Sequence, residues 1–293
     1  MSHPAARRAL LALIAASFLF GATFVVIKSA LEDIPPMEFV AWRFLIGAVA
    51  AMVIAFPRGR QIWRDGAITG LALFAGYALQ TMGLAITSAS NSALITGMYV
   101  VLTPFIASLV RRRAPSPWVV LAAAASFAGI YLLSDTDGLS LSRGDLLTLG
   151  CAFAFAFHII ALSRYAHRHP ILPYTGVQLL TTAVLAFPVA AIQGGVSLPG
   201  SSVWPALLLT GLGVGIGAFM LQVWAQTVVG PSTAAIILAA EPAFGVATAW
   251  VVLDERLDVA GWIGTALVVF AIFLVVTRQE EDVATAEAVT EAH

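Results

Sequence analysis

Apolar residues fill most of this chain in ten stretches that are each close to twenty residues long, with short polar segments between them. An α-helix rises about 1.5 Å per residue, so about twenty apolar residues cross a hydrocarbon core of roughly 30 Å. The pattern therefore predicts an all-α polytopic membrane protein with ten transmembrane helices. We place the spans near residues 9–29, 36–56, 66–86, 91–110, 116–134, 145–165, 171–192, 204–226, 233–253 and 259–277.

The first five stretches resemble the second five in spacing and, weakly, in sequence. A shift of 135 residues, for example, pairs Pro35 with Pro170. Because each repeat has an odd number of spans, the second copy must be inverted across the membrane. We expect a first five-helix repeat at 1–140, an inverted second repeat at 141–279 and a disordered acidic tail at 280–293. A carrier with its site between the halves fits this plan, and a duplicated bundle with another role is the alternative.

Basic residues gather in alternate junctions between the predicted spans. If the N-terminus is inside, eleven of the fifteen basic residues lie on the cytosolic side, namely Arg7, Arg8, Arg58, Arg60, Arg64, Arg111, Arg112, Arg113, Arg164, Arg168 and Arg278. The outer junctions instead collect acidic residues, among them Glu32, Asp33, Asp254 and Glu255. The positive-inside rule therefore places both termini in the cytosol.

Composition narrows the class of protein further. Charged residues make up 11% of the chain, against roughly 25% in a soluble domain. The net charge of -1 argues against nucleic acid as a partner, so the expected partners are the lipid bilayer and a small-molecule substrate. Cys151 is the only cysteine, and an intramolecular disulfide therefore cannot form. A monomer and a homo-oligomer are equally compatible with the sequence.

Three segments carry a resemblance to a known family. They are SFLFGATFVVIK in the first span, WRF at 42–44, and AAEPAFGVATAWVVLDERLDVAGWIGTALVVFAIFLV at 239–275. With these motifs the chain resembles the EamA-like ten-span carriers of the drug/metabolite transporter superfamily, and it is most similar to YddG-type bacterial exporters of aromatic and other amino acids. The resemblance implies alternating access in the bacterial cytoplasmic (inner) membrane. It also implies a central cavity lined by the first, third, fourth, sixth, eighth and ninth spans, with the fifth and tenth at the periphery.

Glu241 is the clearest candidate for chemistry inside the predicted bilayer. A charged group at the midplane costs from about 2.5 kcal/mol to several times that value, so polar residues there tend to face a cavity or a partner. The next residue, Pro242, has no amide hydrogen and leaves the carbonyl of Leu238 without its usual donor. A carboxyl group beside such a break can bind a cation, a substrate ammonium group or a proton. A protonated Glu241 that hydrogen-bonds a neighbouring helix is the alternative.

Polar residues recur at helical spacing on one face of the fourth predicted span, as Ser92, Thr96, Tyr99 and Thr103. Tyr99 lies near mid-depth, as does Tyr77 in the third span, where Gln80 follows one turn later. Their polar groups can bind a zwitterion while the rings stack on its side chain. The predicted substrate-binding cavity therefore includes Tyr77, Gln80, Thr96 and Tyr99, and hydrogen bonding between helices is the alternative.

Two further polar residues lie within predicted spans. His158 in the sixth span can titrate near neutral pH, so we include it in the cavity and assign it, with Glu241, to proton coupling. A neutral donor between helices is the alternative for His158. Arg43 in the second span is interpreted as structural, either paired with Glu38 or extended toward the membrane edge, with binding of a substrate carboxylate as the alternative.

The eighth span combines candidate gate residues with a run of glycines. Near its cytosolic end lie the three candidates for gating, Gln222, Trp224 and Gln226. The run TGLGVGIGA at 210–218 contains two glycine pairs with the spacing of close helix contacts, Gly211 with Gly215 and Gly213 with Gly217. The run predicts close helix approach or bending.

Motifs of the rival classes of protein do not occur in this sequence. It has no His-Glu-x-x-His, no Gly-x-Ser-x-Gly and no pair of carboxylates within the spans, so we expect no catalytic residues. It also lacks a Walker motif, and we expect neither a cofactor nor a metal. Ion channels usually carry rings of charge at their filters, whereas this core is nearly neutral.

The residues and the resemblance together predict a secondary transporter. The predicted lining offers aromatic faces and hydroxyl groups with few fixed charges, which suits small, largely apolar zwitterions such as aromatic and other neutral amino acids. Export follows from the resemblance alone. Efflux of lipophilic cationic drugs or of other metabolites is the alternative, because Glu241 and the aromatic rings can bind a cation.

Overall fold

Helices form every regular element in the described part of the chain. The computed structural model describes residues 3–84, 86, 95–112, 114–133, 142–241, 243–245, 247, 248 and 259–291. Its elements are α1 (His3–Ala22), α2 (Phe24–Ala30), α3 (Pro36–Ile54), α4 (Arg60–Leu84), α6 (Tyr99–Arg111), α7 (Pro117–Leu133), α8 (Arg143–Tyr165), η1 (Ala166–Arg168), α9 (Ile171–Gln193), α10 (Trp204–Leu208), η2 (Leu209–Ala218), α11 (Phe219–Ala225), α12 (Pro231–Leu238) and α14 (Val259–Glu291). The prediction of an all-helical protein is confirmed for these residues.

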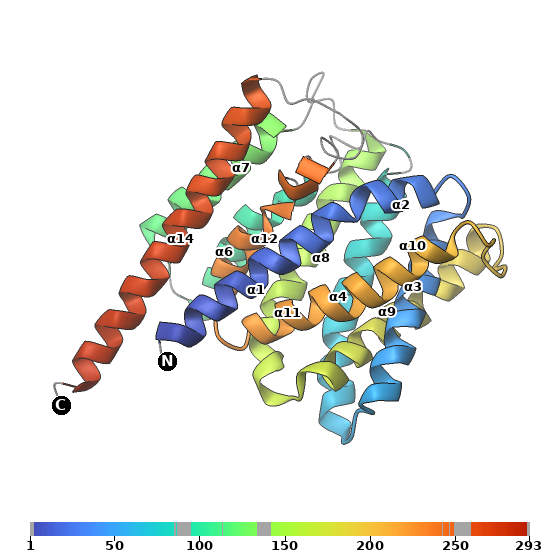
Figure 1. Cartoon of the computed structure of the whole chain (residues 1–293), viewed down its shortest axis with the longest axis horizontal. Helices are drawn as coiled ribbons and strands as arrows, with labels where there is room; N and C mark the ends of the chain where they lie inside the picture. The colour runs from blue at the N-terminus through green and yellow to red at the C-terminus, as the bar shows by residue number, and fades with distance from the viewer. Residues whose placement is uncertain are drawn as a thin grey trace.

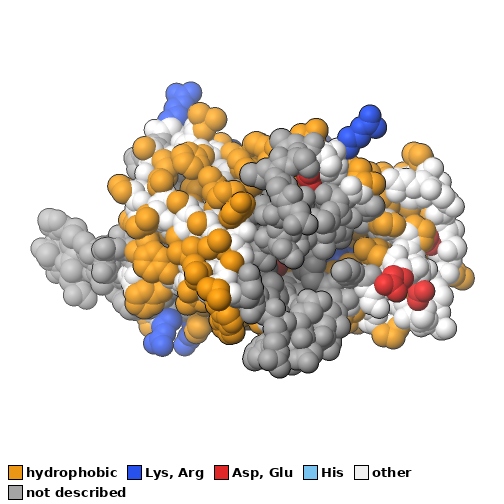
Figure 2. Space-filling view, turned by 90° about the horizontal axis from the view of Figure 1, so that it is seen from above, with side chains coloured by type: hydrophobic (Ala, Val, Ile, Leu, Met, Phe, Trp, Pro, Cys, Tyr) orange, Lys and Arg blue, Asp and Glu red, His pale blue; other side chains and the backbone are white. Residues whose placement is uncertain are grey.

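Five of the described helical segments have the length and apolar composition of membrane spans. Five segments are long and apolar enough to cross a bilayer, namely Pro4–Ala22, Pro36–Ile54, Arg143–Arg168, Ile171–Gln193 and Trp204–Ala225. Hydrophobic side chains cover much of the described surface that Figure 2 draws. Val53 and Leu109 are 81% and 80% exposed. An apolar surface of this extent suits lipid rather than water, as expected of a polytopic membrane protein.

Local sequence explains where several helices begin. Pro36 and Pro231 stand in the first turns of α3 and α12, where a proline sacrifices no helical hydrogen bond. At the start of α8, the Asp145 amide donates to Ser142 Oγ at 3.2 Å, and the Ser142 amide donates to the Asp145 carboxylate at 2.7 Å. This capping box fixes the start of a helix that runs through the interior.

Helices from the two predicted halves interleave (Figure 1). α3 packs along α9, α4 packs against both α8 and α9, and α7 packs along α14 at one edge of the molecule. α1 contacts α11, α12 and η2, and α6 contacts α8 and α12. Helices of each half therefore lie against helices of the other, and side chains from both halves meet in the interior.

The first and eighth predicted spans are interrupted. The first consists of α1 and α2, separated at Thr23, whose hydroxyl donates to the carbonyls of Leu19 and Phe20 at 3.0 Å. Such bonds back to the preceding turn often bend helices. In the eighth span α10, η2 and α11 follow one another, and η2 is a π-helix over the glycine-rich run. A π-helix of this length is rare, and it replaces the simple bend that the sequence predicts.

The glycine-rich run brings η2 into close contact with α3. A Cβ atom on Gly47 would lie 2.6 Å from the carbonyl oxygen of Gly211, and a Cβ on Gly211 would lie 2.7 Å from that of Arg43. The close approach predicted at Gly211 is therefore confirmed. Gly213 meets only Leu209 of its own helix, at 3.6 Å, so the second predicted glycine pair contributes less to this packing.

Contacts between junctions agree with the sides of the membrane that the charges predict. The carboxylate of Asp65, near the start of α4, lies 2.9 Å from Nε2 of His169, which follows η1. Both residues lie at predicted cytosolic junctions. Ser202 donates to the carboxylate of Asp33 at 2.9 Å, and both of these residues belong to predicted outer junctions. Each contact joins the two halves at one end of the bundle.

The last helix extends beyond its predicted span. α14 continues to Glu291, whereas the sequence predicts a disordered tail at 280–293. Alanine and glutamate dominate this segment, and both favour helix even without packing. Residues 292 and 293 lie outside the described residues. So do the segment 251–258, with its DERLD motif, and the predicted boundary between the repeats at 134–141.

Candidate substrate-binding site

Glu241 follows directly after a break in the ninth span. α12 ends at Leu238, two turn residues follow, and the chain is helical again at Glu241. Pro242 itself lies outside the described residues, but a proline there leaves the Leu238 carbonyl without an amide donor. The hydroxyl of Ser17 in α1 donates to this carbonyl at 3.0 Å and to that of Ile237 at 3.1 Å. α1 therefore supplies the hydrogen bond that the proline removes.

A second contact with α1 fixes the backbone at Glu241. Gly21 lies so close to the Glu241 carbonyl that even a methyl group would collide with it, and a Cβ there would also lie 2.9 Å from the amide of Gly245. The side chain of Glu241 is partly exposed although its neighbours in α12 are buried. The break therefore places a partly exposed glutamate on a rigidly held backbone.

The two predicted tyrosines converge on Phe155 of α8. Tyr77 in α4 and Tyr99 in α6 both make edge-to-face contacts with Phe155 of α8, with ring centroids 5.3 Å and 6.5 Å apart. Both tyrosines also lie within electrostatic range of Glu241. Phe44 of α3 adds another ring, 5.0 Å from that of Tyr77. Side chains from four helices thus form one cluster of rings and hydroxyl groups in the interior.

Gln80 and Thr96 extend this cluster along α4. The amide nitrogen of Gln80 donates to Thr96 Oγ1 at 3.4 Å, and that oxygen lies 3.9 Å from Sγ of Cys151. Thr103 donates to the carbonyl of Tyr99 in its own helix, at 2.7 Å. Ser92, at the start of the predicted polar face, lies outside the described residues. The face therefore contacts neighbouring helices through Thr96 and Tyr99.

His158 forms a hydrogen bond between α8 and α9. Its Nε2 lies 3.2 Å from Oε1 of Gln178, whose amide nitrogen donates to the Tyr174 carbonyl at 3.3 Å. Since the Gln178 nitrogen is a donor, its oxygen accepts, and His158 Nε2 carries the proton. The imidazole is buried and lies edge-on to Phe219. This geometry matches the neutral donor, and proton coupling through His158 stays a prediction.

The candidate gate residues connect α11 to α8. Gln222 donates to Gln226 at 3.2 Å, and Gln226 donates to the carbonyl of Ile159 at 2.7 Å and to the hydroxyl of Ser163 at 2.8 Å. Both glutamines are buried, while Trp224 is partly exposed and packs against the hydrophobic core. These bonds hold two helices together, and a gating role for the three residues stays a prediction.

Arg43 departs from its structural interpretation. Its side chain is 4% exposed and does not extend to the surface. Glu38, its expected partner, instead accepts from the amide and the hydroxyl of Ser197 at 2.8 Å and 3.0 Å. Residues five apart on a helix point to different sides, because neighbours on one face are three or four apart. The pairing with Glu38 is therefore wrong, and Arg43 lies instead against Tyr77, 4.5 Å from its ring centroid.

The interior polar cluster, the broken ninth span and the two interleaved halves suit a membrane carrier, and comparison with known families agrees. The model of the EamA-like transporter family matches the chain twice, at residues 7–135 and 142–277. The chain belongs to the EamA-like transporter family. An uncharacterized transporter of Archaeoglobus fulgidus is 33% identical to this EamA-like transporter over 268 residues, which are 92% of this chain and 85% of that one.

Other relatives of this EamA-like transporter share its fold and length. The uncharacterized transporter YwfM of Bacillus subtilis is 26% identical over 290 residues, 93% of this chain and 95% of that one. A solved structure, described only as the crystal structure of a protein, covers 91% of this chain with a TM-score of 0.78 and 21% identity, and 97% of its own chain is covered. The last similarity concerns the fold alone.

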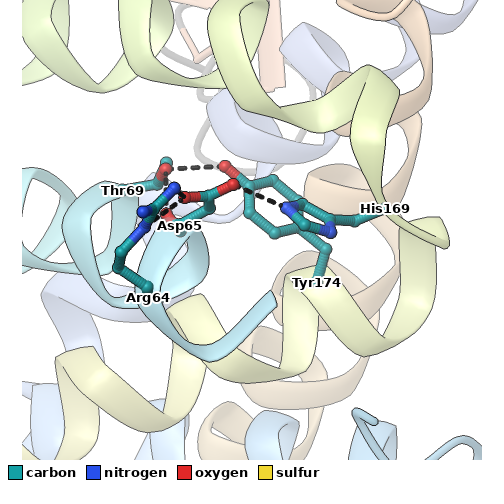
Figure 3. A network of polar contacts seen from close by, with 5 residues as sticks. All are labelled: Arg64, Asp65, Thr69, His169 and Tyr174. Carbon is teal, nitrogen blue, oxygen red and sulfur yellow. Dashed lines mark hydrogen bonds and ion pairs between the residues drawn. The ribbon is translucent and has the colours of Figure 1, made fainter. Parts of the chain in front are cut away.

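A second polar cluster of this EamA-like transporter lies at the opening turns of α4 (Figure 3). Asp65 is fully buried, and Arg64 donates to its carboxylate twice at 3.0 Å while His169 contacts it at 2.9 Å. Thr69 donates to the Asp65 carbonyl, so it accepts from the Tyr174 hydroxyl at 2.6 Å. Burial acts to raise the pKa of Asp65, but the hydrogen bonds from His169 and Arg64 lower it by more.

Sequence reasoning missed Ser17, Asp65 and the surroundings of Arg43. Pro242 does predict that some donor must serve the Leu238 carbonyl, because unsatisfied backbone groups are costly in lipid. The sequence does not indicate which helix lies beside that carbonyl. The contact of Asp65 with His169 could have been expected from the sequence, because the charge pattern places both junctions on the cytosolic side of the membrane.

Proposed function

We propose that this EamA-like transporter exports small, largely apolar zwitterions, chiefly aromatic and other neutral amino acids, by alternating access around a central cavity. The observation that carries the proposal is the cluster of Tyr77 and Tyr99 around Phe155 in the interior, together with a partly exposed Glu241 at the break in the ninth span. Rings can pack on an apolar side chain while the polar groups bind its charged end. Export rests on the resemblance to YddG-type exporters.

The pattern of helix contacts supports a ten-helix plan with inverted repeats. An inverted repeat relates each predicted span to the span five places away. The third span (α4) then corresponds to the eighth (η2 and α11), and the sixth (α8) corresponds to the first (α1). The contact of α4 with α8 therefore corresponds to the contact of α11 and η2 with α1. The contact of α4 with α9 becomes that of η2 with α3, and the contact of α6 with α8 becomes that of α12 with α1. The pairs α3–α9 and α7–α14 map onto themselves. A two-fold relation between the halves produces this pattern.

The same plan suits a location in the bacterial cytoplasmic membrane with both termini in the cytosol. The junctions that contain Arg64 and Arg168 adjoin at one end of the bundle through Asp65 and His169. Exposed basic residues at that end satisfy the positive-inside rule only if it faces the cytosol. α7 and α14, which pair at the edge of the bundle, correspond to the predicted peripheral spans.

Efflux of lipophilic cations has weaker support. A cation could bind Glu241 and the surrounding rings. Arg43 lies in the same cluster, however, and its charge repels a cation that has no carboxylate to offer. The aromatic amino acids carry both charges and fit both residues.

Counterflow tests the proposal directly. Purified protein in liposomes is loaded with unlabelled phenylalanine, methionine or threonine, and entry of the labelled compound is followed, with lipophilic cations and sugar phosphates as parallel loads. We expect accumulation with the amino acids. Accumulation of labelled compound with the cations alone would favour drug efflux over the proposed function. No accumulation with any of the amino acids, from protein shown to be folded, would refute the proposed function.

A pair of tyrosine variants localises the activity. Tyr99→Ala removes a ring from the cluster and should raise the phenylalanine concentration for half-maximal counterflow about tenfold, because the lost apolar contact is worth more than 1 kcal/mol. Tyr131→Ala is the matched control, since Tyr131 is 41% exposed on α7, far from the cluster in sequence and on a peripheral helix. Equal behaviour of the two variants would remove Tyr99 from the site.

A further inference from the structure

Arg43 is a buried cation in the middle of an apolar bundle. Its guanidinium carbon lies 4.5 Å from the ring centroid of Tyr77 and 4.7 Å from that of Phe44. An ionised side chain within the bilayer is costly. Desolvated cation–π contacts offset part of this cost, so rings can hold the charge there. They do not neutralise it.

An anionic partner for Arg43 is missing from the part of the chain that the structure describes. No carboxylate of the described residues comes within ion-pair distance of its guanidinium, and Glu38 is engaged by Ser197. Buried guanidinium groups are normally paired with carboxylates or phosphates, which they bind through two parallel hydrogen bonds. The residue therefore retains the capacity to bind a carboxylate from elsewhere.

The position of Arg43 is fixed rather than adaptable. Its carbonyl lies against Gly211 of η2, where a Cβ would come within 2.7 Å of the oxygen. One turn further along α3, Gly47 meets the Gly211 carbonyl just as closely. These contacts fix the backbone of Arg43 against the π-helix, and the rings of Tyr77 and Phe44 lie beside its guanidinium.

Glu241 provides the opposite charge across the same cluster. Arg43 and Glu241 lie within electrostatic range of each other, and Tyr77 lies within range of both. The two charged groups are nevertheless farther apart than the roughly 4 Å of a direct ion pair. An acidic and a basic group that interact electrostatically without a direct ion pair can both be bound by a molecule that carries both complementary charges.

We propose that Arg43 binds the carboxylate of the substrate while Glu241 binds its ammonium group. This inference rests on the proposed function and deepens it, because it makes a compound with both charges, an amino acid, the required ligand class. The side chain of the substrate then packs among Phe44, Tyr77, Phe155 and Phe219, whose rings adjoin one another. A primary amine without a carboxylate leaves Arg43 unpaired and is rejected.

Three ligands that share one ring and differ only in charge test the assignment. They are phenylalanine, 2-phenylethylamine, which lacks the carboxylate, and 3-phenylpropanoate, which lacks the ammonium group. Counterflow of each is measured for the wild type, Arg43→Gln, Arg43→Lys and Arg164→Gln. Arg164 is the matched control, because it is exposed at the end of α8. Size-exclusion profiles establish that each variant is folded.

Arg43→Gln should raise the phenylalanine concentration for half-maximal counterflow at least about tenfold, whereas Arg164→Gln should leave it unchanged. In the wild type, 2-phenylethylamine should need a higher concentration than phenylalanine for half-maximal counterflow, and this difference should be smaller in Arg43→Gln. Arg43→Lys should give values between those of the wild type and Arg43→Gln. Unchanged phenylalanine exchange in Arg43→Gln would overturn the assignment and leave the proposed function standing.

Other outcomes separate the two proposals. If the wild type exchanges 3-phenylpropanoate but not phenylalanine, and Arg43→Gln loses this exchange, the carboxylate role stands and the zwitterion function falls. If the wild type exchanges only 2-phenylethylamine, both fall. Should Arg43→Gln not fold, inhibition of wild-type phenylalanine counterflow decides: N-acetylphenylalanine must compete better than phenylalanine amide, and the reverse order overturns the carboxylate role.

Discussion

Hydrogen bonding divides the polar side chains of the interior into two groups. Ser17, His158 and Gln226 each bond to a neighbouring helix. Such bonds contribute about 0.6 kcal/mol on average in membrane proteins, so they fasten helices without dominating stability. Glu241 is partly exposed, and Arg43 has no ion pair among the described residues. The second group keeps the bonding capacity that a ligand needs.

Asp65 should stabilise the protein in proportion to its ionisation. Asp65→Asn should lower the apparent melting temperature of the purified protein by roughly 5 °C at neutral pH, because it removes a buried carboxylate that His169 and Arg64 bind. The pKa of Asp65 is lowered from its ordinary value of 3.8. The difference from wild type should therefore be complete above about pH 4 and disappear as the pH falls through the lowered value.

Asp33→Asn is the control for this prediction. Asp33 carries the same functional group but is exposed at the opposite end, where it accepts only from Ser202 in the described structure. Its substitution should leave the melting temperature unchanged. The groups that face Asp65 are Arg64 on its own helix, His169 after η1 and Tyr174 on α9. An Asp65→Asn variant as stable as wild type at pH 7 would contradict the assigned role.

For single residues, the sequence indicated which polar side chains lie inside the bundle better than it indicated which side chains they contact. Tyr77, Tyr99 and Glu241 were predicted because polar groups near the midplane are costly. The structure packs both tyrosine rings against Phe155, and binding of a substrate by the three residues stays a prediction. Arg43 was assigned to Glu38 because the two are near in sequence. Its actual neighbour Tyr77 lies on another helix, and only tertiary packing determines that contact.

Glycine determines how the central helices approach each other. The contacts of Gly47 with Gly211 and of Gly21 with Glu241 both place backbone directly against backbone. Lipid provides no hydrophobic force between helices, so association depends on close van der Waals packing of this kind. The two contacts flank the polar cluster, one beside Arg43 and the other beside Glu241.

Gly211→Ala should destabilise the protein by about 2 kcal/mol, or roughly 5 °C in apparent melting temperature, because the added methyl group collides with the Arg43 carbonyl. Gly213→Ala is the matched control in the same π-helix, where a Cβ meets only Leu209 at 3.6 Å. It should leave stability unchanged or raise it slightly. If both variants melt alike, the α3–η2 contact is looser than described.

The type of each element followed from the sequence, but its internal geometry did not. Apolar runs of about twenty residues predict helices because only a helix satisfies its own backbone in lipid. The π-helix at Leu209–Ala218 has the same apolar composition as an α-helix, so hydropathy does not distinguish the two. The glycine spacing did predict the contact at Gly211, since that contact depends on residue size.

For the whole molecule, the two contacts between junctions define opposite ends. Asp65 with His169 marks one end, and Asp33 with Ser202 marks the other. α9 runs between these ends, from Ile171 to Gln193. The charge pattern assigns the first end to the cytosol, so residues on either side of α9 should differ in their access from outside.

Cysteine labelling in intact bacterial cells tests this orientation. A membrane-impermeant maleimide should label Ser202→Cys from outside, and it should label Arg164→Cys only after the membrane is permeabilised. Both positions are exposed. The unaltered protein is the control, because its single cysteine, Cys151, is buried and should stay unlabelled. If Arg164→Cys is labelled in intact cells and Ser202→Cys only after permeabilisation, the protein has the opposite orientation to the one proposed.

Ser17 has a consequence for the exposure of backbone at the break in the ninth span. Its hydroxyl has one hydrogen but lies within bonding distance of two carbonyl oxygens, at 3.0 Å and 3.1 Å. Either carbonyl can therefore take its hydrogen bond from the neighbouring helix. A proline break inside the bilayer is tolerated in this way, because a side chain of α1 covers the backbone that the proline leaves open to lipid.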